Sequence, residues 1–447
     1  MTTPSTRKPN VIWVFGDQHR AQALSHMGDP NVNTPEIDRL SNDGFCSTAA
    51  VMGTPLCCPA RGSILTGRYP HACVPGHEER LPEGQATIAT PFKEAGYHTA
   101  LFGKRHLDGF KERNGRGAFH TIPPERRGGF DDWVAFENNN SQWDCWVHGH
   151  RNGKEVPHYR LPGYETDELT SLLIDHIQQR AKPEASNQPF FTILSVQPPH
   201  DPYVAPAQYM ARHNPATLLM RPNVPNIKSS IDTARRDLAG YYAMIENLDD
   251  NLGRVRAALA ATGLAENTHI VFFSDHGDMH GSHGQFRKTS PWEESIRVPF
   301  AIGGLQTYGH HRGRTNLLVN HVDIAPTTLG LCGIEKPSWM QGTDFSGWRV
   351  KNRPKAAAPD SAFLQLVMAT RHQDSTDRPW RGVVTADGWK YVCVQGSPYM
   401  LFNLSDDPYE QANHVFNSRY GAQRTKLHER LAQWIADTGD KFELPVV

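Results

Sequence analysis

Residues 10–17, NVIWVFGD, decide how this chain can be organised. From Asn10 to Phe15 the run is almost continuously apolar and rich in β-forming residues, and it ends at Gly16 and Asp17. A run without polar alternation is typical of a strand that is buried on both faces, as in a parallel sheet. We therefore expect a central strand over residues 10–15, with Asp17 at its carboxyl end.

Helix and strand patterns alternate along the chain beyond this strand. Helices are predicted over residues 34–44, 92–95, 167–180 and 231–261, the last with a break near Gly240. Strands are predicted over residues 99–102, 190–196, 269–274 and 298–302. This alternation predicts an α/β fold with a mostly parallel sheet sandwiched by helices. In such a fold the functional residues lie in loops at the carboxyl ends of the strands.

The pattern changes after Lys351. Residues 351–360, KNRPKAAAPD, resemble a linker, and residues 381–394 form two β-rich runs joined by Asp387-Gly388, which predicts a hairpin. A terminal helix is predicted over residues 427–438. We expect a catalytic domain over 1–351 and a small α+β C-terminal subdomain over 352–447.

Composition excludes some classes of function. The 46 Lys and Arg residues nearly balance the 47 Asp and Glu residues, which argues against a nucleic-acid or anionic-membrane partner. No apolar run approaches the roughly 18 residues of a membrane span. The polar start, MTTPSTRKPN, does not resemble a signal peptide, and the seven cysteines are scattered without a framework. A cytoplasmic location is therefore expected.

Two acidic residues close predicted strands that are far apart in sequence. Asp17-Gln18 follows the first strand, and Asp275-His276 follows the strand over 269–274. If they converge at one sheet edge, their oxygens suit Ca²⁺ or Mg²⁺, and the histidine also admits Mn²⁺ or Zn²⁺. The alternative is that each aspartate only caps a turn.

Cationic and histidine side chains follow other strand ends. Lys104 and His106 come after the strand over 99–102, and His200 comes after the strand over 190–196. With Lys288 and Arg61 they would surround a pocket for a multiply charged anion whose transition state gains negative charge. The alternative for each residue is a solvated charge or a turn.

The doubled cysteine in residues 54–70, TPLCCPARGSILTGRYP, needs its own explanation. A disulfide between neighbouring residues is strained and rare. Cys57 and Cys58 are therefore either two small buried side chains, or one of them takes part in chemistry.

This segment resembles the type I sulfatases. Cys57 to Arg61 matches the family signature C-x-P-x-R, and Leu65 to Arg68 matches its usual continuation. The segments GYHTALFGKRH, QPPHDPY and SDHGDMHGSHGQFRKTSPWEESIRVP are also similar to family motifs, in the expected order. The resemblance covers nearly the whole chain and implies the alkaline-phosphatase-like fold.

The resemblance also implies that a formylglycine-generating enzyme oxidises Cys57 to Cα-formylglycine. Pro59 and Arg61 lie two and four residues after Cys57, whereas Ala60 stands where Cys58 would need the proline. Hydrated and bound to the metal, the aldehyde would present a nucleophilic hydroxyl that attacks sulfur and releases the alcohol. Loss of a proton from its second hydroxyl would then expel sulfate.

Carried over residue by residue, the resemblance implies a role for each candidate. One divalent ion, Ca²⁺ most of all with Mn²⁺ or Mg²⁺ possible, would be held by Asp17, Gln18, Asp275, His276 and the modified Cys57. Arg61 would hold the formylglycine and the metal carboxylates, Lys104 and Lys288 would bind sulfate, His106 would assist the diol, and His200 would protonate the leaving oxygen.

The pairs at Asp17-Gln18 and Asp275-His276 resemble those of choline sulfatases and phosphonate monoester hydrolases. The predicted function is hydrolysis of a sugar, aryl or small-alcohol sulfate ester, and the alternative is a phosphonate monoester or phosphodiester hydrolase. A third possibility is a non-catalytic anion-binding homologue in which Cys57 stays a thiol.

Several other residues have weaker indications. Asp278 and His283 could approach the site. Residues 138–164, which include Trp143 and Trp146, could line a carbohydrate subsite or form a surface loop. Trp380 and Arg381 could add to its rim.

Overall fold

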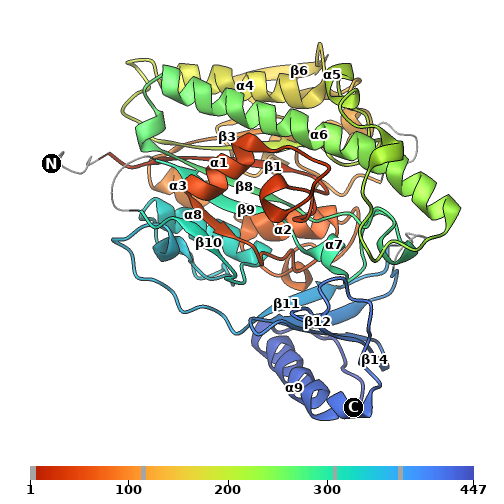
Figure 1. Ribbon diagram of the computed structural model, residues 1–447. Helices are drawn as coiled ribbons and strands as arrows, with labels where there is room; N and C mark the ends of the chain where they lie inside the picture. The colour runs from red at the N-terminus through yellow and green to blue at the C-terminus, as the bar shows by residue number, and fades with distance from the viewer. Residues whose placement is uncertain (1–6, 112–116, 306–309, 371–375) are drawn as a thin grey trace.

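The computed structural model describes residues 7–111, 117–305, 310–370 and 376–447. Two helical layers enclose a ten-stranded sheet, and a smaller sheet with one long helix lies beside them (Figure 1). Residues 1–6, which contribute to the expectation that the chain has no signal peptide, lie outside the described residues. No helix in the described part of the chain is both long enough and apolar enough to cross a membrane.

The large sheet is parallel at its centre and antiparallel toward its edges. β8, β1, β7, β3 and β4 run parallel, whereas β9 is antiparallel to both β8 and β2. The predicted mostly parallel sheet between helices is confirmed. In spatial order the strands are β10 (Gly313–Thr315), β2 (Phe45–Ser47), β9 (Phe300–Gly304), β8 (Thr268–Ser274), β1 (Asn10–Gly16), β7 (Phe190–Val196), β3 (His98–Lys104), β4 (Asp132–Phe136), β5 (Trp146–Arg151) and β6 (Lys154–Arg160).

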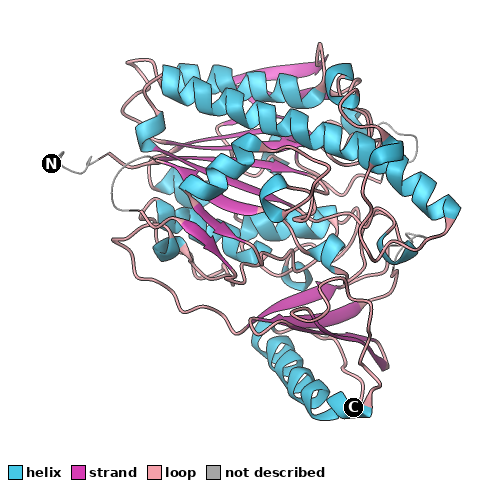
Figure 2. Cartoon of the chain, in the orientation of Figure 1, coloured by secondary structure: helices cyan, strands magenta, loops and turns pink. Residues whose placement is uncertain are grey.

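The strand that contains NVIWVF lies in the middle of this sheet and is buried along its whole length. Val11 and Trp13 belong to the core under the helices at residues 57–66, 89–94 and 324–331, whereas Ile12 and Val14 belong to the core under the helices at residues 35–43, 165–180 and 228–261. Because successive side chains of a strand point to opposite faces, an unbroken apolar run is what two helical layers require (Figure 2).

The predicted helices end within one residue of the prediction, but four of them begin earlier than predicted, at Ala89, Glu165, Lys228 and Gly421. The predicted start at Pro35 and stop at Gly44 are confirmed for the first helix. The α-helices are α1 (Pro35–Asp43), α2 (Cys57–Thr66), α3 (Ala89–Glu94), α4 (Glu165–Arg180), α5 (Ala207–Met210), α6 (Lys228–Ala261), α7 (Glu293–Ile296), α8 (Ile324–Leu331) and α9 (Gly421–Thr438).

The predicted break of the longest helix near Gly240 is wrong, because α6 continues without interruption. The glycine serves a close approach instead: a Cβ at this position would lie 2.1 Å from the backbone oxygen of Tyr203. The loop after β7, which carries His200, therefore packs directly against the helix.

The smaller sheet is antiparallel and contains the predicted hairpin. Its strands are β11 (Ser361–Leu366), β12 (Trp380–Thr385), β13 (Trp389–Val394) and β14 (Ser397–Asn403). One face packs on α9, and the other shares a core with Val51, Leu56 and Ile296 of the larger part. The division into domains at residues 351 and 352 stays a prediction.

Gly103, the residue before Lys104 in β3, allows a close contact that a replacement can test. Its φ is +105°, and a Cβ there would lie 2.0 Å from the backbone oxygen of Ser195 in β7. We expect Gly103→Ala to lower the free energy of unfolding by at least about 3 kcal/mol, because it combines backbone strain with a steric clash.

Gly96→Ala is the matched control, since its φ of +84° is also left-handed but a Cβ there meets no atom within 4 Å. It should cost only about 1 kcal/mol. Denaturant unfolding followed by tryptophan fluorescence measures both variants, and equal losses would contradict the clash.

Candidate active site

The polar strand ends of the large sheet meet at one edge. Asp17 follows β1, Asp275 follows β8, and Lys104 is the last residue of β3. These strands lie close together in the order β8, β1, β7, β3, with His200 in the loop after β7. Parallel strands end on the same side of a sheet, so residues up to 258 positions apart lie together here.

Arg61 joins the two carboxylates. Its Nε donates to Asp275 Oδ2 at 3.0 Å and its NH2 donates to Asp17 Oδ2 at 3.1 Å. Its NH1 donates to the backbone oxygen of Lys104 at 2.9 Å and to Ser195 Oγ at 2.8 Å. All of these side chains are buried. The guanidinium therefore ties α2 to four strands and offsets two negative charges that water cannot reach.

Cys57 is the first residue of α2 and points into this group. Its Sγ lies 3.1 Å from Lys288 Nζ, which donates to it, and 3.1 Å from His276 Nε2. Burial alone would raise the pKa of the thiol, but the charges of Lys288, His276 and Lys104 outweigh it and hold the pKa well below its ordinary value. The environment of Cys57 is thus built for an anionic atom.

The structure brings together a set of side chains that suits a divalent cation. Ligand atoms of Asp17, Cys57, Asp275 and His276 all lie within 4.8 Å of one another, and all four residues are buried. His276 Nδ1 donates to the backbone oxygen of Gly277 at 3.0 Å, so Nε2 is the ring nitrogen that faces the group. Carboxylate oxygens with one imidazole fit Ca²⁺, Mg²⁺ or Mn²⁺.

Gln18 is held so that its oxygen faces the same group. Its Nε2 donates to Asp278 Oδ2 at 2.5 Å, and its Oε1 accepts from Lys288 Nζ at 2.8 Å. Tyr203 also donates to Asp278 Oδ2 at 2.5 Å. Asp278 thus acts through Gln18, a role that its sequence position only hinted at, and the sequence placed Tyr203 only within the family-like segment QPPHDPY, without a role.

His200 lies beside Lys288 in the same group of side chains. Lys288 Nζ is 2.8 Å from His200 Nε2, and His200 Nδ1 donates to the backbone oxygen of Asp201 at 2.8 Å. The pKa of Lys288 is raised: burial would lower it, but the charges of Cys57, Asp17 and Asp201 outweigh this effect. Lys288 is therefore a cation within hydrogen-bond distance of His200 Nε2.

His106 completes the group near Cys57. Burial first, and then the charge of Lys104, lower the pKa of His106 to about 3. Its backbone φ is +55°, and Gln18 and the neighbours of Lys288 also have left-handed values: Gln18 +73°, Arg287 +67° and Thr289 +73°. Strain of this kind gathers at functional sites and persists only where the surroundings hold it.

The expected rim residues from the smaller sheet do not line a rim. Trp380 is fully buried, and its Nε1 donates to the backbone oxygen of Thr289 at 3.0 Å, directly after Lys288. Arg381 is buried and pairs with Asp440. Both expectations are wrong because these residues of β12 are buried in the protein interior, where the indole of Trp380 holds the backbone of the loop that carries Lys288.

Two other weaker indications have a clear outcome. His283 stacks on Trp292 with ring centroids 3.7 Å apart and takes no part in the group around Cys57. Residues 138–164 mostly form the β5–β6 hairpin, and Gln142 Nε2 donates to the backbone oxygen of His200 at 3.0 Å. The neighbouring Trp143 is 45% exposed.

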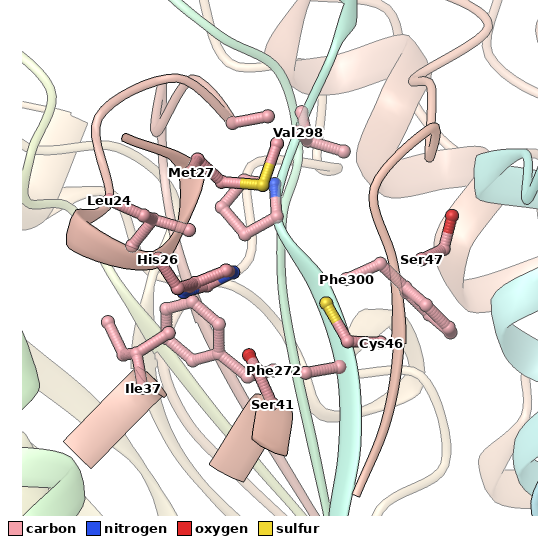
Figure 3. Close-up of a pocket in the computed structure, with 13 residues that line it drawn as sticks. Leu24, His26, Met27, Ile37, Ser41, Cys46, Ser47, Phe272, Val298 and Phe300 are labelled. Carbon is pink, nitrogen blue, oxygen red and sulfur yellow. The ribbon is translucent and has the colours of Figure 1, made fainter. Parts of the chain in front are cut away.

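A separate small pocket contains none of these residues. Figure 3 shows it between the loop after β1, α1 and the strands β2 and β9, with a lining that is mostly apolar. Burial raises the pKa of Cys46, the thiol in this pocket, so this cysteine stays protonated. The pocket is a packing defect of the core and has none of the charged groups that an anionic substrate needs.

Removal of Arg61 tests whether it is the electrostatic centre of this site. We expect Arg61→Gln, in buffer without divalent ions, to lower the free energy of unfolding by about 3–5 kcal/mol, since two buried carboxylates lose the guanidinium between them and only Asp17 keeps a lysine, Lys104, at 2.7 Å. The exposed pair of Arg160 and Asp144, at 2.8 Å, supplies the control. Arg160→Gln should cost less than about 1 kcal/mol in the same urea titration, and similar costs would refute the assignment.

Family models match the chain over most of its length. A model described as Sulfatase matches residues 9–334. A second one, described as the C-terminal part of N-sulphoglucosamine sulphohydrolase, matches residues 281–437.

Three known proteins are similar to this chain. An ulvan-active sulfatase of Formosa agariphila is 34% identical over 98% of this chain and 83% of its own. A structure from work on the metabolism of multiple glycosaminoglycans by Bacteroides thetaiotaomicron has a TM-score of 0.83 at 26% identity, with 97% of both chains covered. Phosphonate monoester hydrolase of Agrobacterium radiobacter has a TM-score of 0.76 at 22% identity over 96% of both chains, which shows a shared fold.

The first model covers well over half of the chain, and the Formosa relative matches nearly all of it. The chain therefore belongs to the sulfatase family and is a sulfuric ester hydrolase.

Proposed function

We propose that this sulfatase hydrolyses a carbohydrate sulfate ester through a formylglycine made from Cys57. The observation that carries the proposal is the position of Cys57 at the N-terminus of α2, with its side chain among Lys288, His276 and Asp17. A side chain here lies among the carboxylates and the cations that would bind a sulfate, and Lys104 Nζ donates directly to Asp17 Oδ2 at 2.7 Å.

The adjacent cysteine has a different environment. Burial first, and then the charge of Cys57, raise the pKa of Cys58 well above its ordinary value. Its Sγ accepts from the backbone N–H of Glu78 at 3.4 Å. Cys58 is therefore a protonated packing residue. Because Cys57 is only 1% exposed, a formylglycine-generating enzyme would need to reach it before folding is complete.

We assign the metal site to Asp17, Gln18, Asp275 and His276 together with the converted Cys57. The three oxygen-bearing side chains favour Ca²⁺, and the imidazole keeps Mn²⁺ and Mg²⁺ open. When bound, the ion would lower the pKa of a hydroxyl of the hydrated aldehyde and withdraw charge from a sulfate oxygen.

The lysines and histidines of the site would bind the substrate and move protons. Lys104 and Lys288 offset the negative charge that develops on the sulfate oxygens, and the N-terminus of α2 adds to their effect. The converted Cys57 would supply the hydroxyl oxygen that bonds to sulfur as the bond from sulfur to the ester oxygen breaks, and the proton of this hydroxyl would already have left to solvent because the ion lowers its pKa. His200 Nε2 delivers the proton that this leaving oxygen takes up.

The second half of the cycle releases sulfate. His106 would take the proton of the remaining hydroxyl, which would let the carbon–oxygen double bond form again as the bond from this carbon to the sulfate oxygen breaks. Water then adds to the aldehyde and restores the diol. The low pKa of His106 keeps its imidazole neutral and able to accept a proton.

A carbohydrate is the class of substrate that the surroundings favour. Trp143 is 45% exposed beside Gln142, which binds the backbone of the His200 loop, and an exposed indole can stack on a sugar face. Two similar proteins support the same class: one is an ulvan-active sulfatase, and the other comes from work on the metabolism of glycosaminoglycans. We infer a cytoplasmic location from the seven free, buried cysteines.

The two cysteines offer a matched test of the nucleophile. In the wild type we expect the peptide with Cys57 to be lighter by about 18 Da, because oxygen replaces the elements of hydrogen sulfide. Cys57→Ala should abolish sulfate release from aryl and sugar sulfates, whereas Cys58→Ala should keep most of it.

Peptide mass spectrometry and sulfate detection measure these outcomes, and circular dichroism checks the fold of each variant. An aryl phosphodiester in the same assay tests the alternative activity and should be cleaved more slowly than the aryl sulfate. Turnover by folded Cys57→Ala would overturn the assignment.

A leaving-group comparison tests the acid role of His200. We expect His200→Gln to lower kcat/KM for sugar sulfates by about 10²–10⁴-fold, because an alkoxide needs a proton as it leaves. An aryl sulfate with an acidic phenol should lose less than about tenfold. His283→Gln, remote from the site, should change neither value, and equal losses for both substrates in His200→Gln would contradict the role.

A further inference from the structure

A second group of metal-ligating side chains lies at the opposite edge of the large sheet from the active site. His98 is the first residue of β3, Asp132 is the first residue of β4, and His176 comes from α4. Lys104 of the active site closes the same strand that His98 opens. A seven-residue strand spans about 20 Å, so the two groups are separate.

The three side chains converge on one carboxylate oxygen. Asp132 Oδ2 lies 3.7 Å from His98 Nε2 and 3.7 Å from His176 Nδ1. One ligand atom of each residue lies within 4.8 Å of the other two. Ligand atoms around a tetrahedral zinc ion with bonds of about 2.0–2.1 Å are about 3.3 Å apart, so small side-chain shifts would complete the geometry.

Hydrogen bonds within the described part of the chain do not explain this arrangement. His176 is 1% exposed, yet neither of its ring nitrogens has a hydrogen-bond partner, and Nδ1 of His98 has none either. The distances of 3.7 Å to Asp132 are too long for a hydrogen bond. Buried polar atoms without partners are uncommon, and one of these, His176 Nδ1, faces the Asp132 carboxylate.

The protonation states suit a metal. Burial lowers the pKa of His176 to about 4 and also lowers the pKa of His98, so both imidazoles are neutral at pH 7. Burial would raise the pKa of Asp132, but its contacts with His176 and Asn152 lower it overall, so the carboxyl is ionised. These are the forms in which the three side chains bind metals.

The surroundings support and open the site. The backbone N–H of Asn152 donates to Asp132 Oδ1 at 2.7 Å, which leaves Oδ2 directed at the two imidazoles. A surface cavity of about 350 Å³ reaches all three residues. Arg180 also lines this cavity, and its positive charge would repel a cation. Its guanidinium is directed to Gln188, however, where NH2 donates to Oε1 at 3.0 Å.

We propose that His98, Asp132 and His176 bind one transition-metal ion of the Zn²⁺ type, with a water from the cavity as the fourth ligand. Two imidazoles and one carboxylate form a donor set that favours Zn²⁺ over Ca²⁺ or Mg²⁺. The ion ties the last turns of α4 to the starts of β3 and β4.

To test this proposal, the full-length protein is titrated with Zn²⁺ by calorimetry and with Co²⁺ by visible absorption. Excess Ca²⁺ is present in both titrations so that it fills the catalytic site. The wild type should bind one Zn²⁺, and Asp132→Asn and His98→Gln should weaken it at least 100-fold. Asp132→Asn keeps an oxygen for the N–H of Asn152, and His98 is only partly buried, so both replacements are mild. If one variant fails to fold, the other decides.

His158→Gln is the matched control, because His158 forms a stacked pair with His148 at 4.2 Å but belongs to no such cluster. It should bind Zn²⁺ like the wild type. Asp275→Asn should also keep this Zn²⁺ site, which separates it from the catalytic metal. Equal Zn²⁺ binding by the wild type, Asp132→Asn and His98→Gln would overturn the proposal, as would a wild type that binds none.

Discussion

The active site depends on one buried ionic contact, the guanidinium of Arg61 between the carboxylates of Asp17 and Asp275. The two aspartates end neighbouring strands, so the fold brings two negative charges together in the interior. Arg61 offsets these charges and also holds the ends of β3 and β7 through Lys104 and Ser195. Burying such a group costs free energy that its attraction only partly recovers. Its position is explained by the site that it organises rather than by stability.

The remaining side chains of the site are held by contacts outside it. Asp278 and Tyr203 orient Gln18, and α6 approaches the Tyr203 loop closely because residue 240 has no side chain. Trp380 of the smaller sheet supports the backbone beside Lys288. The left-handed backbone of Gln18, His106 and the neighbours of Lys288 needs such support. The smaller sheet thus contributes to the candidate active site by packing against the loop that carries Lys288.

Much of the architecture could be read from local pattern. The apolar run at residues 10–15 predicted the central strand, and polar residues directly after strands predicted the side chains that meet at its edge. The errors have a common origin. Gly240 was expected to break a helix, and Trp380 and Arg381 were expected at a rim, because helix propensity and side-chain chemistry are local properties. Whether a glycine serves a close approach, or a tryptophan is buried, depends on the segment packed against it.

By itself, the sequence determined the fold class and the strand ends, since periodicity is a property of short segments, and its resemblance to the sulfatase signature favoured Cys57 over Cys58. Only the tertiary structure decided how Gln18 is oriented, that Lys288 binds both Gln18 and His200, and that His98, Asp132 and His176 meet at the far edge. These contacts join residues 34 to 270 positions apart. They arise when whole elements pack, and no local pattern records which side chains then face each other.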